Sequence, residues 1–275
     1  MGRKRAARFS LAGSIVIILL LISAYALISR KIILLPGDDA FSENALADES
    51  GPVPIQVKVF GTSSTGKTIT GYEIGTGPDC LLLLGAIHGD EMGTAALLHQ
   101  LISVIERDPG ILPPSKKLVI IPIVNPEGYY DRTDKLNDDG VNLNLNFDTM
   151  SWQEYGPEGT YAGPEPFSEP ESRLIRQIVE EYNPYAMISF HAQGGLVSPE
   201  DNEVSQEWGR WYAAETGYDY FDGWEYAGTA TAWFVEQTGR PAITVELHTN
   251  LGSDWDINKD VLLKLIGAAG TNLPG

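Results

Sequence analysis

The chain of 275 residues has one cysteine and four histidines. With Cys80 alone, no disulfide can form within the chain. Cys80 opens the apolar run Cys80-Leu-Leu-Leu-Leu84. We expect a buried, unreactive thiol there, because a nucleophilic cysteine needs an electropositive and accessible setting.

Positive charge is scarce after residue 31. The first 31 residues hold six of the 19 Lys and Arg and no acid, which leaves 13 bases against 37 acids in residues 32–275. A domain this acidic repels polyanions, so we expect no nucleic-acid partner. The acidic surface favours solubility rather than a specific cationic ligand.

Charge is absent from the apolar stretch Leu11 to Ile28, which four bases precede and two follow. At a rise of about 1.5 Å per residue the stretch spans about 27 Å, close to the thickness of a hydrocarbon core. The basic flank predicts that the N-terminus stays inside and the rest is exported. Ala24-Tyr25-Ala26 resembles a cleavage site. Residues 1–31 are therefore a signal anchor or a signal peptide, and we expect an extracytoplasmic protein, anchored in the membrane or secreted after cleavage.

Residues 32–52 are polar and turn-rich and are predicted to be a linker before one folded domain, residues 53–275. Apolar strands and amphipathic helices alternate in this domain, and Ser168 and Glu171 have capping-box spacing before one helix. The pattern predicts an α/β fold with a mixed, largely parallel central sheet flanked by helices, and sites at the carboxyl ends of strands. The expected strands are 57–60, 68–74, 80–86, 118–124, 186–190 and 242–247, and the expected helices are 92–106, 171–182, 204–216, 231–238 and 259–266.

Three polar motifs stand at the ends of expected strands. His88-Gly-Asp-Glu91 follows one strand directly, and a His and a Glu three residues apart can share a zinc ion. His191 ends a second strand before a glycine turn. Glu246 closes a third, otherwise apolar strand, where a carboxylate needs a partner or a function. Beside a metal, such a carboxylate can move the proton of a water molecule.

Several further motifs occur in one characteristic order. They are Asn125-Pro-Glu-Gly128, Gly140-Val-Asn-Leu-Asn144, Phe167-Ser-Glu-Pro-Glu171, Phe190-His191 and Thr244-Val-Glu246, all after His88-x-x-Glu91. In this order the chain resembles the zinc carboxypeptidase family from about Val57 to its end, and its compact bacterial members in particular. The resemblance implies one Zn²⁺ per chain bound by His88, Glu91 and His191, with Glu246 as general acid and base.

The resemblance also implies substrate-binding residues, and two positions depart from it. Asn144 is kept, but Leu145 stands where the family has an arginine that binds the substrate's terminal carboxylate, and leucine cannot replace a guanidinium. Lys135 stands where an arginine stabilises the oxyanion, a role that a lysine can fill as a point charge. Arg132, three residues earlier, could replace either arginine.

A closing tyrosine and a specificity pocket complete what the resemblance implies. Tyr226 fits the tyrosine position loosely, and Trp224 is equally well placed. Thr231 occupies the floor of the pocket, so the sequence gives no support for a preference for Lys or Arg.

These features predict a zinc-dependent peptidase or amidase that acts outside the cytoplasm, plausibly on cell-wall peptides. Two alternatives stay open. One is an acyl-amino-acid deacylase of the desuccinylase type, which the export segment disfavours. The other is a zinc-bearing peptide-binding module with weak or lost hydrolysis, which the intact Glu246 disfavours.

Overall fold

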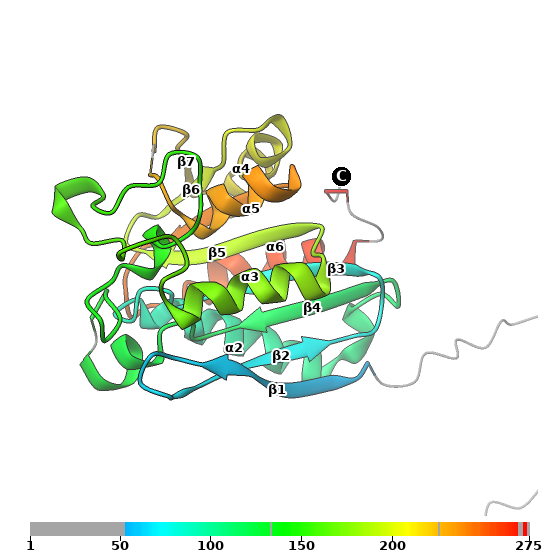
Figure 1. Cartoon of the computed structure of the whole chain (residues 1–275). Helices are drawn as coiled ribbons and strands as arrows, with labels where there is room; N and C mark the ends of the chain where they lie inside the picture. Colours follow the sequence, from blue (N-terminus) through cyan, green and yellow to red (C-terminus); the bar gives the residue numbers. More distant parts are fainter. Residues whose placement is uncertain (1–52, 133, 225, 269–271, 274–275) are drawn as a thin grey trace, which may run out of the picture. The chain divides into compact units, whose positions relative to one another are not determined.

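The computed structural model describes residues 53–132, 134–224, 226–268 and 272–273, and eight strands of this region form one mixed sheet (Figure 1). The strand order is β1-β2-β4-β3-β5-β8-β6-β7. The strands are β1 (Ile55–Thr62), β2 (Thr68–Ile74), β3 (Asp79–Leu84), β4 (Lys116–Ile121), β5 (Ala186–Ala192), β6 (Leu196–Pro199), β7 (Asp219–Tyr220) and β8 (Ala242–Leu247).

The four central strands, β4, β3, β5 and β8, run parallel to one another. Strands covered on both faces are apolar along their whole length rather than alternating, and β3 follows this rule with Cys80–Leu84 buried. Burial raises the pKa of the Cys80 thiol to about 12, as expected for an unreactive cysteine. Antiparallel partners join on either side: β2 pairs with β4, and β6 pairs with β8.

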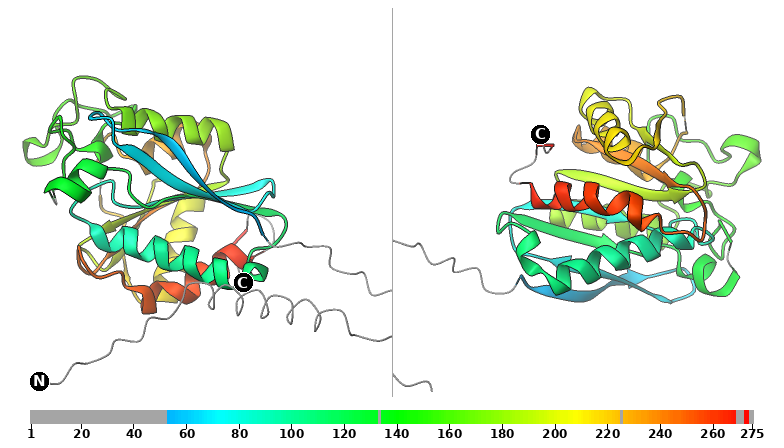
Figure 2. Two further views of the ribbon diagram at one scale, coloured as in Figure 1. Left: turned by 90° about the horizontal axis from the view of Figure 1, so that it is seen from below. Right: turned by 180° about the vertical axis from the view of Figure 1, so that it is seen from behind.

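Helices cover both faces of the sheet (Figures 1 and 2). On one face α2 (Met92–Arg107), α4 (Glu203–Thr216) and α6 (Trp255–Gly267) pack over a core that includes Leu98 and Tyr212. On the other face α3 (Pro170–Tyr182) and α5 (Ala230–Thr238) pack over a second core that includes Phe234. This arrangement leaves the carboxyl ends of the parallel strands free of covering helices, and the loops there can form a site.

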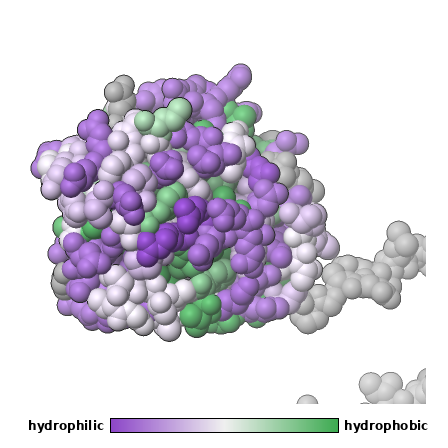
Figure 3. All heavy atoms as spheres, viewed as in Figure 1, coloured by the Kyte–Doolittle hydropathy of each residue, from purple (hydrophilic) through white to green (hydrophobic). Residues whose placement is uncertain are grey.

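The predicted α/β class, strands and helices are confirmed, with two additions and one correction. The additions are β6 and β7, which are four and two residues long and were not predicted. The capping box does not form, because Glu171 accepts a hydrogen bond from the backbone N–H of Ser64 and Ser168 Oγ donates to Glu169. The surface seen from the side of α3 and α5 is mostly hydrophilic with smaller apolar patches (Figure 3).

The predicted N-terminal segment, residues 1–31, and linker, residues 32–52, lie outside the described residues, so both stay predictions. Within the described ranges, none of the helices combines the length and the apolar character that crossing a membrane requires.

Candidate active site

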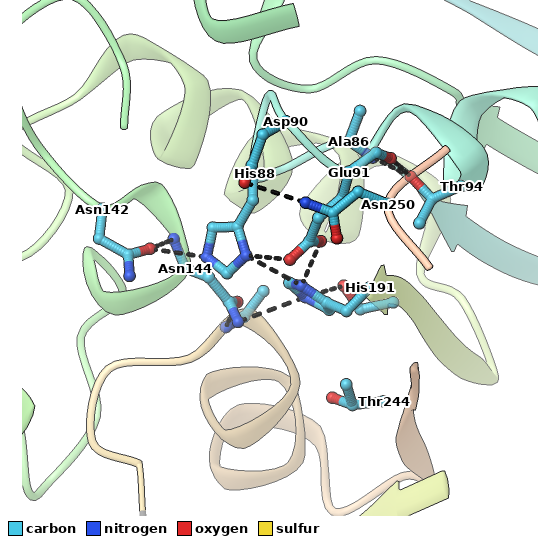
Figure 4. A network of polar contacts seen from close by, with 12 residues as sticks. Ala86, His88, Asp90, Glu91, Thr94, Asn142, Asn144, His191, Thr244 and Asn250 are labelled. Carbon is cyan, nitrogen blue, oxygen red and sulfur yellow. Dashed lines mark hydrogen bonds and ion pairs between the residues drawn. The ribbon is translucent and has the colours of Figure 1, made fainter. Parts of the chain in front are cut away.

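Three side chains that can bind a metal ion meet where two neighbouring parallel strands end. His88 and Glu91 lie on the loop between β3 and α2, and His191 lies near the end of β5, which pairs with β3 (Figure 4). All three side chains are buried, and one potential ligand atom from each lies within 4.8 Å of the others. In the described ranges this is the one such cluster of His, Cys, Asp or Glu. The structure thus brings the predicted metal ligands together.

The loop that carries His88 and Glu91 is held by close backbone packing and by side-chain hydrogen bonds. A Cβ atom on Gly89 would lie 2.2 Å from the carbonyl carbon of Gly128, so only glycine allows these two backbones to touch. Thr94 Oγ1 accepts a hydrogen bond from Ala86 N–H at 2.8 Å and donates one to the Glu91 carbonyl at 2.7 Å. These contacts hold the backbone of Glu91 in place.

Both imidazole rings turn one nitrogen toward Glu91 and the other away from it. His88 Nδ1 lies 2.8 Å from Glu91 Oε1, His191 Nδ1 lies 3.0 Å from Glu91 Oε2, and the two Nδ1 atoms are 3.3 Å apart. On the far side, His88 Nε2 lies 2.9 Å from Asn142 Oδ1, which only accepts hydrogen bonds. His88 Nε2 therefore carries the proton, and Nδ1 presents the lone pair that a metal ligand needs.

The electrostatics of this cluster suit a cation. Burial works to raise the pKa of Glu91, but His88 and His191 outweigh it and hold that pKa at about 2, so the carboxylate is ionised. Burial lowers the pKa of His88 and favours its neutral form. Burial also works to lower the pKa of His191, but Glu91 and Glu246 outweigh it and raise that pKa, so metal binding displaces a proton from His191. Two imidazoles and one carboxylate beside an open pocket are a common donor set for catalytic zinc, so the residues fit one Zn²⁺.

Glu246 lies next to this cluster, on the neighbouring strand. β5 and β8 pair in parallel with His191 opposite Glu246, and both side chains line the same pocket. Burial raises the pKa of Glu246 to about 7; Glu91 adds to the increase, while His191 and Lys135 oppose it. A carboxyl group that titrates near neutrality can both accept and donate a proton.

The pocket in front of these residues has a volume of about 300 Å³ and collects most of the predicted substrate residues. Lys135, Asn144, Tyr226 and Thr231 all line it. Asn144 Nδ2 lies 3.3 Å from His191 Nε2. The Tyr226 ring packs against Trp224 at a centroid distance of 5.6 Å, and Trp224 lines the pocket as well.

Arg132 ends the helical turn η2 (Gly128–Arg132), but its side chain is outside the described part of the structure, so its role stays a prediction. Leu145 is buried in the pocket wall, and it ends the short turn η3 (Leu143–Leu145). Among the described residues that line the pocket, Lys135 is the single Lys or Arg. The described pocket therefore offers no guanidinium to a substrate carboxylate.

Two pocket residues were missed by sequence reasoning. Asn142 orients His88, and its place two residues before Asn144 in the Asn-Leu-Asn motif was a usable signal. Glu200 follows β6 and lines the pocket. No local signal pointed to it, because β6 itself was not predicted.

Comparisons with known proteins agree with this geometry. A family model described as zinc carboxypeptidase matches residues 46–252. Murein peptide amidase A of Escherichia coli strain K12 is 26% identical over 205 residues, which cover 68% of this chain and 80% of that protein. The fold is similar to murein-tripeptide amidase from Escherichia coli O157, with a TM-score of 0.60 at 22% identity over 78% of this chain and 93% of the other. It is also similar to carboxypeptidase A from Helicoverpa armigera, with a TM-score of 0.64 at 21% identity over 78% and 67% of the two chains.

Proposed function

Because the chain belongs to the zinc carboxypeptidase family and is therefore a zinc-dependent hydrolase, we propose that it cleaves C-terminal or amide-linked peptide bonds of cell-wall peptides outside the cytoplasm. The observation that carries the proposal is the meeting of Glu246 with His88, Glu91 and His191 in one pocket. The similarity to murein peptide amidase A supports cell-wall peptides as the substrate class.

His88, Glu91 and His191 would hold the zinc ion. Zinc at such a site supplies Lewis acidity toward a water molecule and toward the scissile carbonyl. His88 is kept in the required tautomer by Asn142, so the imidazole does not have to reorient when the metal binds.

Glu246 moves the proton. Its carboxylate accepts a proton from the attacking water and later delivers it to the departing amine, which completes one turnover with the carboxylate regenerated. A pKa near 7 lets one side chain do both near neutral pH. Lys135 is the single Lys or Arg among the described residues that line the pocket, and it would stabilise the negative charge that develops on the carbonyl oxygen.

Two features of this chain direct it away from plain C-terminal peptides and toward an extracytoplasmic substrate. Leu145 replaces the arginine that would bind a free terminal carboxylate, so a substrate that presents another group at this position fits better. The four bases before the apolar stretch Leu11 to Ile28 are the basis for placing the domain outside the cytoplasm.

The test is a Glu246→Gln variant assayed on zinc-loaded protein with murein tripeptide, plain C-terminal peptides and acylated amino acids. Glutamine keeps the size of the side chain and removes the proton acceptor, so turnover should fall by roughly two to four orders of magnitude. Zinc content should stay at one ion per chain. Unchanged turnover would exclude Glu246 from the mechanism, and a preference for acylated amino acids would favour the deacylase instead.

A further inference from the structure

The predicted metal ligands and Glu246 come from strands that are not all neighbours. His88 and Glu91 lie on the metal loop, residues 85–91, which follows β3, and Glu246 lies on β8. In the sheet β5 lies between β3 and β8, so the carboxyl ends of these two strands are about 10 Å apart, twice the spacing of paired strands. The distance from Glu246 to the two ligands therefore also depends on contacts between the metal loop and the β8–α6 loop, residues 248–254.

One such contact supplies a cap that α2 lacks. Glu91 stands at the N-cap position, but its side chain makes no capping hydrogen bond, because its two carboxylate oxygens face His88 and His191. The first backbone N–H groups of a helix have no partner within the helix and need one from elsewhere. The Asn250 carbonyl, in the β8–α6 loop, provides it and accepts a hydrogen bond from Gly93 N–H at 2.6 Å. The start of α2 is thus tied to the segment that follows Glu246.

The side chain of Asn250 makes a second contact, with the metal loop itself. Its Nδ2 donates to Asp90 Oδ2 at 3.1 Å, and Asp90 directly precedes Glu91 (Figure 4). Asp90 Oδ1 is buried and has no partner among the described residues, so without Asn250 neither oxygen of this carboxylate would have a donor among the described side chains. Such a loss is costly for a charged group. Asn250 therefore holds the chain on both sides of Glu91.

The β8–α6 loop is packed closely enough to hold α2 in place. A Cβ atom on Gly93 would lie 2.1 Å from the Gly252 carbonyl oxygen, so only glycine lets α2 begin this close to the loop. At the far end of the loop, Asp254 Oδ2 accepts hydrogen bonds from His248 N–H at 2.8 Å and from Tyr218 OH at 2.7 Å. The loop is fixed within itself and against α2, so it can transmit the position of β8 to the metal loop.

We propose that Asn250 is a positioning residue that sets the distance between the predicted zinc ligands and Glu246 by joining the metal loop to the β8–α6 loop. The proposal rests on the proposed peptidase function, in which Glu246 moves the proton of the attacking water. Asn250 is not among the described residues that line the pocket, so it acts through Asp90 and Gly93 rather than on the substrate. A displacement of about 1 Å between reacting groups can cost on the order of 100-fold in rate.

The experiment compares Asn250→Ala with the wild type in two assays. Zinc affinity is measured by chelator competition, and kcat and KM are measured on zinc-loaded protein with murein tripeptide. Zinc affinity and kcat should each fall by about 10- to 100-fold, the range for losing a partner that orients metal ligands, while KM should stay within about twofold. Leu251→Ala is the matched control, because Leu251 is the next residue in the loop and is 76% exposed, and all three quantities should match the wild type.

An exchange of the two side chains separates positioning from stability. Asn250→Asp sets two carboxylates against each other and should lower kcat at least as far as Asn250→Ala. Asp90→Asn combined with Asn250→Asp restores an amide donor opposite a carboxylate, and it should return zinc affinity and kcat to within about threefold of the wild type. A residue that only stabilised the fold would change the urea midpoint and leave the zinc affinity and kcat of the folded protein as they were.

The outcomes for the positioning role and for the proposed function can be told apart. If Asn250→Ala keeps wild-type zinc affinity and kcat, raises KM alone, or is not rescued by the exchange, the positioning role is overturned. If no protein hydrolyses the peptide, but zinc affinity falls in Asn250→Ala and recovers in the exchange, the proposed function fails and the positioning of the ligands by Asn250 stands. Should Asn250→Ala not fold, Asn250→Ser keeps a shorter donor, and its zinc affinity and kcat should fall by a smaller factor.

Discussion

Glu171 should make the fold less stable as the pH rises from about 4.5 to about 7. It lies in the first turn of α3, is fully buried, and accepts a hydrogen bond from Ser64 N–H at 3.2 Å through Oε1. Among the described residues, Oε2 has no partner. Burial raises its pKa from the ordinary 4.5 to about 7, and Glu127 and Glu169 add to the increase against the backbone hydrogen bonds that lower it.

The sign and size of the effect follow from this difference in pKa. Between pH 4.5 and 7 the folded protein binds a proton that the unfolded chain has released, so stability present below pH 4.5 is lost progressively until the pH passes about 7. At 1.36 kcal/mol per pKa unit the loss amounts to about 3 kcal/mol. The glutamine of Glu171→Gln cannot ionise, so the stability of this variant should not fall over this pH range. The variant should match the wild type below about pH 4.5 and be more stable by about 3 kcal/mol at pH 8.

Urea unfolding between pH 4.5 and pH 8, with the same chelator added to both proteins, measures the difference. The chelator matters because metal binding is itself pH-dependent and would add a slope to both curves. Glu181→Gln, on the exposed side of the same helix, is the matched control and should follow the wild type at every pH. Parallel curves for the wild type and Glu171→Gln would show that the Glu171 carboxyl titrates alike in the folded and unfolded chain, and would refute the argument.

Three further predictions concern metal, specificity and location. His191→Ala should contain no zinc in elemental analysis, and full retention of zinc by this variant would contradict the ligand assignment. Asn142→Ala should weaken zinc affinity by about 10- to 100-fold in a chelator competition. Leu145→Arg should raise kcat/KM for a free-acid peptide relative to its C-terminal amide, because a hydrogen bond between a guanidinium and a carboxylate contributes about 1.5–3 kcal/mol to binding. An unchanged ratio of the two kcat/KM values would contradict the role given to this position. Protease added outside intact cells should digest an anchored form of residues 32–275, whereas complete protection, with no protein in the medium, would contradict export.

The metal cluster and Glu246 could be predicted because local sequence encodes them. The motifs that carry these residues each follow an apolar stretch whose pattern predicts a strand. The carboxyl ends of parallel strands meet at one edge of a sheet, so the motifs come together there. His88 and Glu91 are also close in sequence, so one turn brings them together. The order of the longer motifs then fixed which residues belong to one site.

Glu200 and the environment of Glu171 could not be predicted, because each depends on a contact between distant segments. Glu200 reaches the pocket through the pairing of β6 with β8, and a four-residue strand that ends in proline gives little periodicity to detect. Glu171 has the spacing of a capping residue, but the segment around Ser64 covers it and takes its carboxylate. Local spacing predicts which groups can interact, and tertiary packing decides which ones do.

The position of β8 between β5 and β6 determines when the site is completed during synthesis. β8 is the last of the described strands in sequence, yet it pairs with β5 on one side and β6 on the other. A nascent chain that ends before residue 242 can already contain all three metal ligands, but it lacks Glu246 and the strand that joins β6 to β5. Pairing across such long sequence separations forms late in folding. Under the proposed role of Glu246, hydrolytic competence arrives with this last strand, and a chain interrupted before it would be inert.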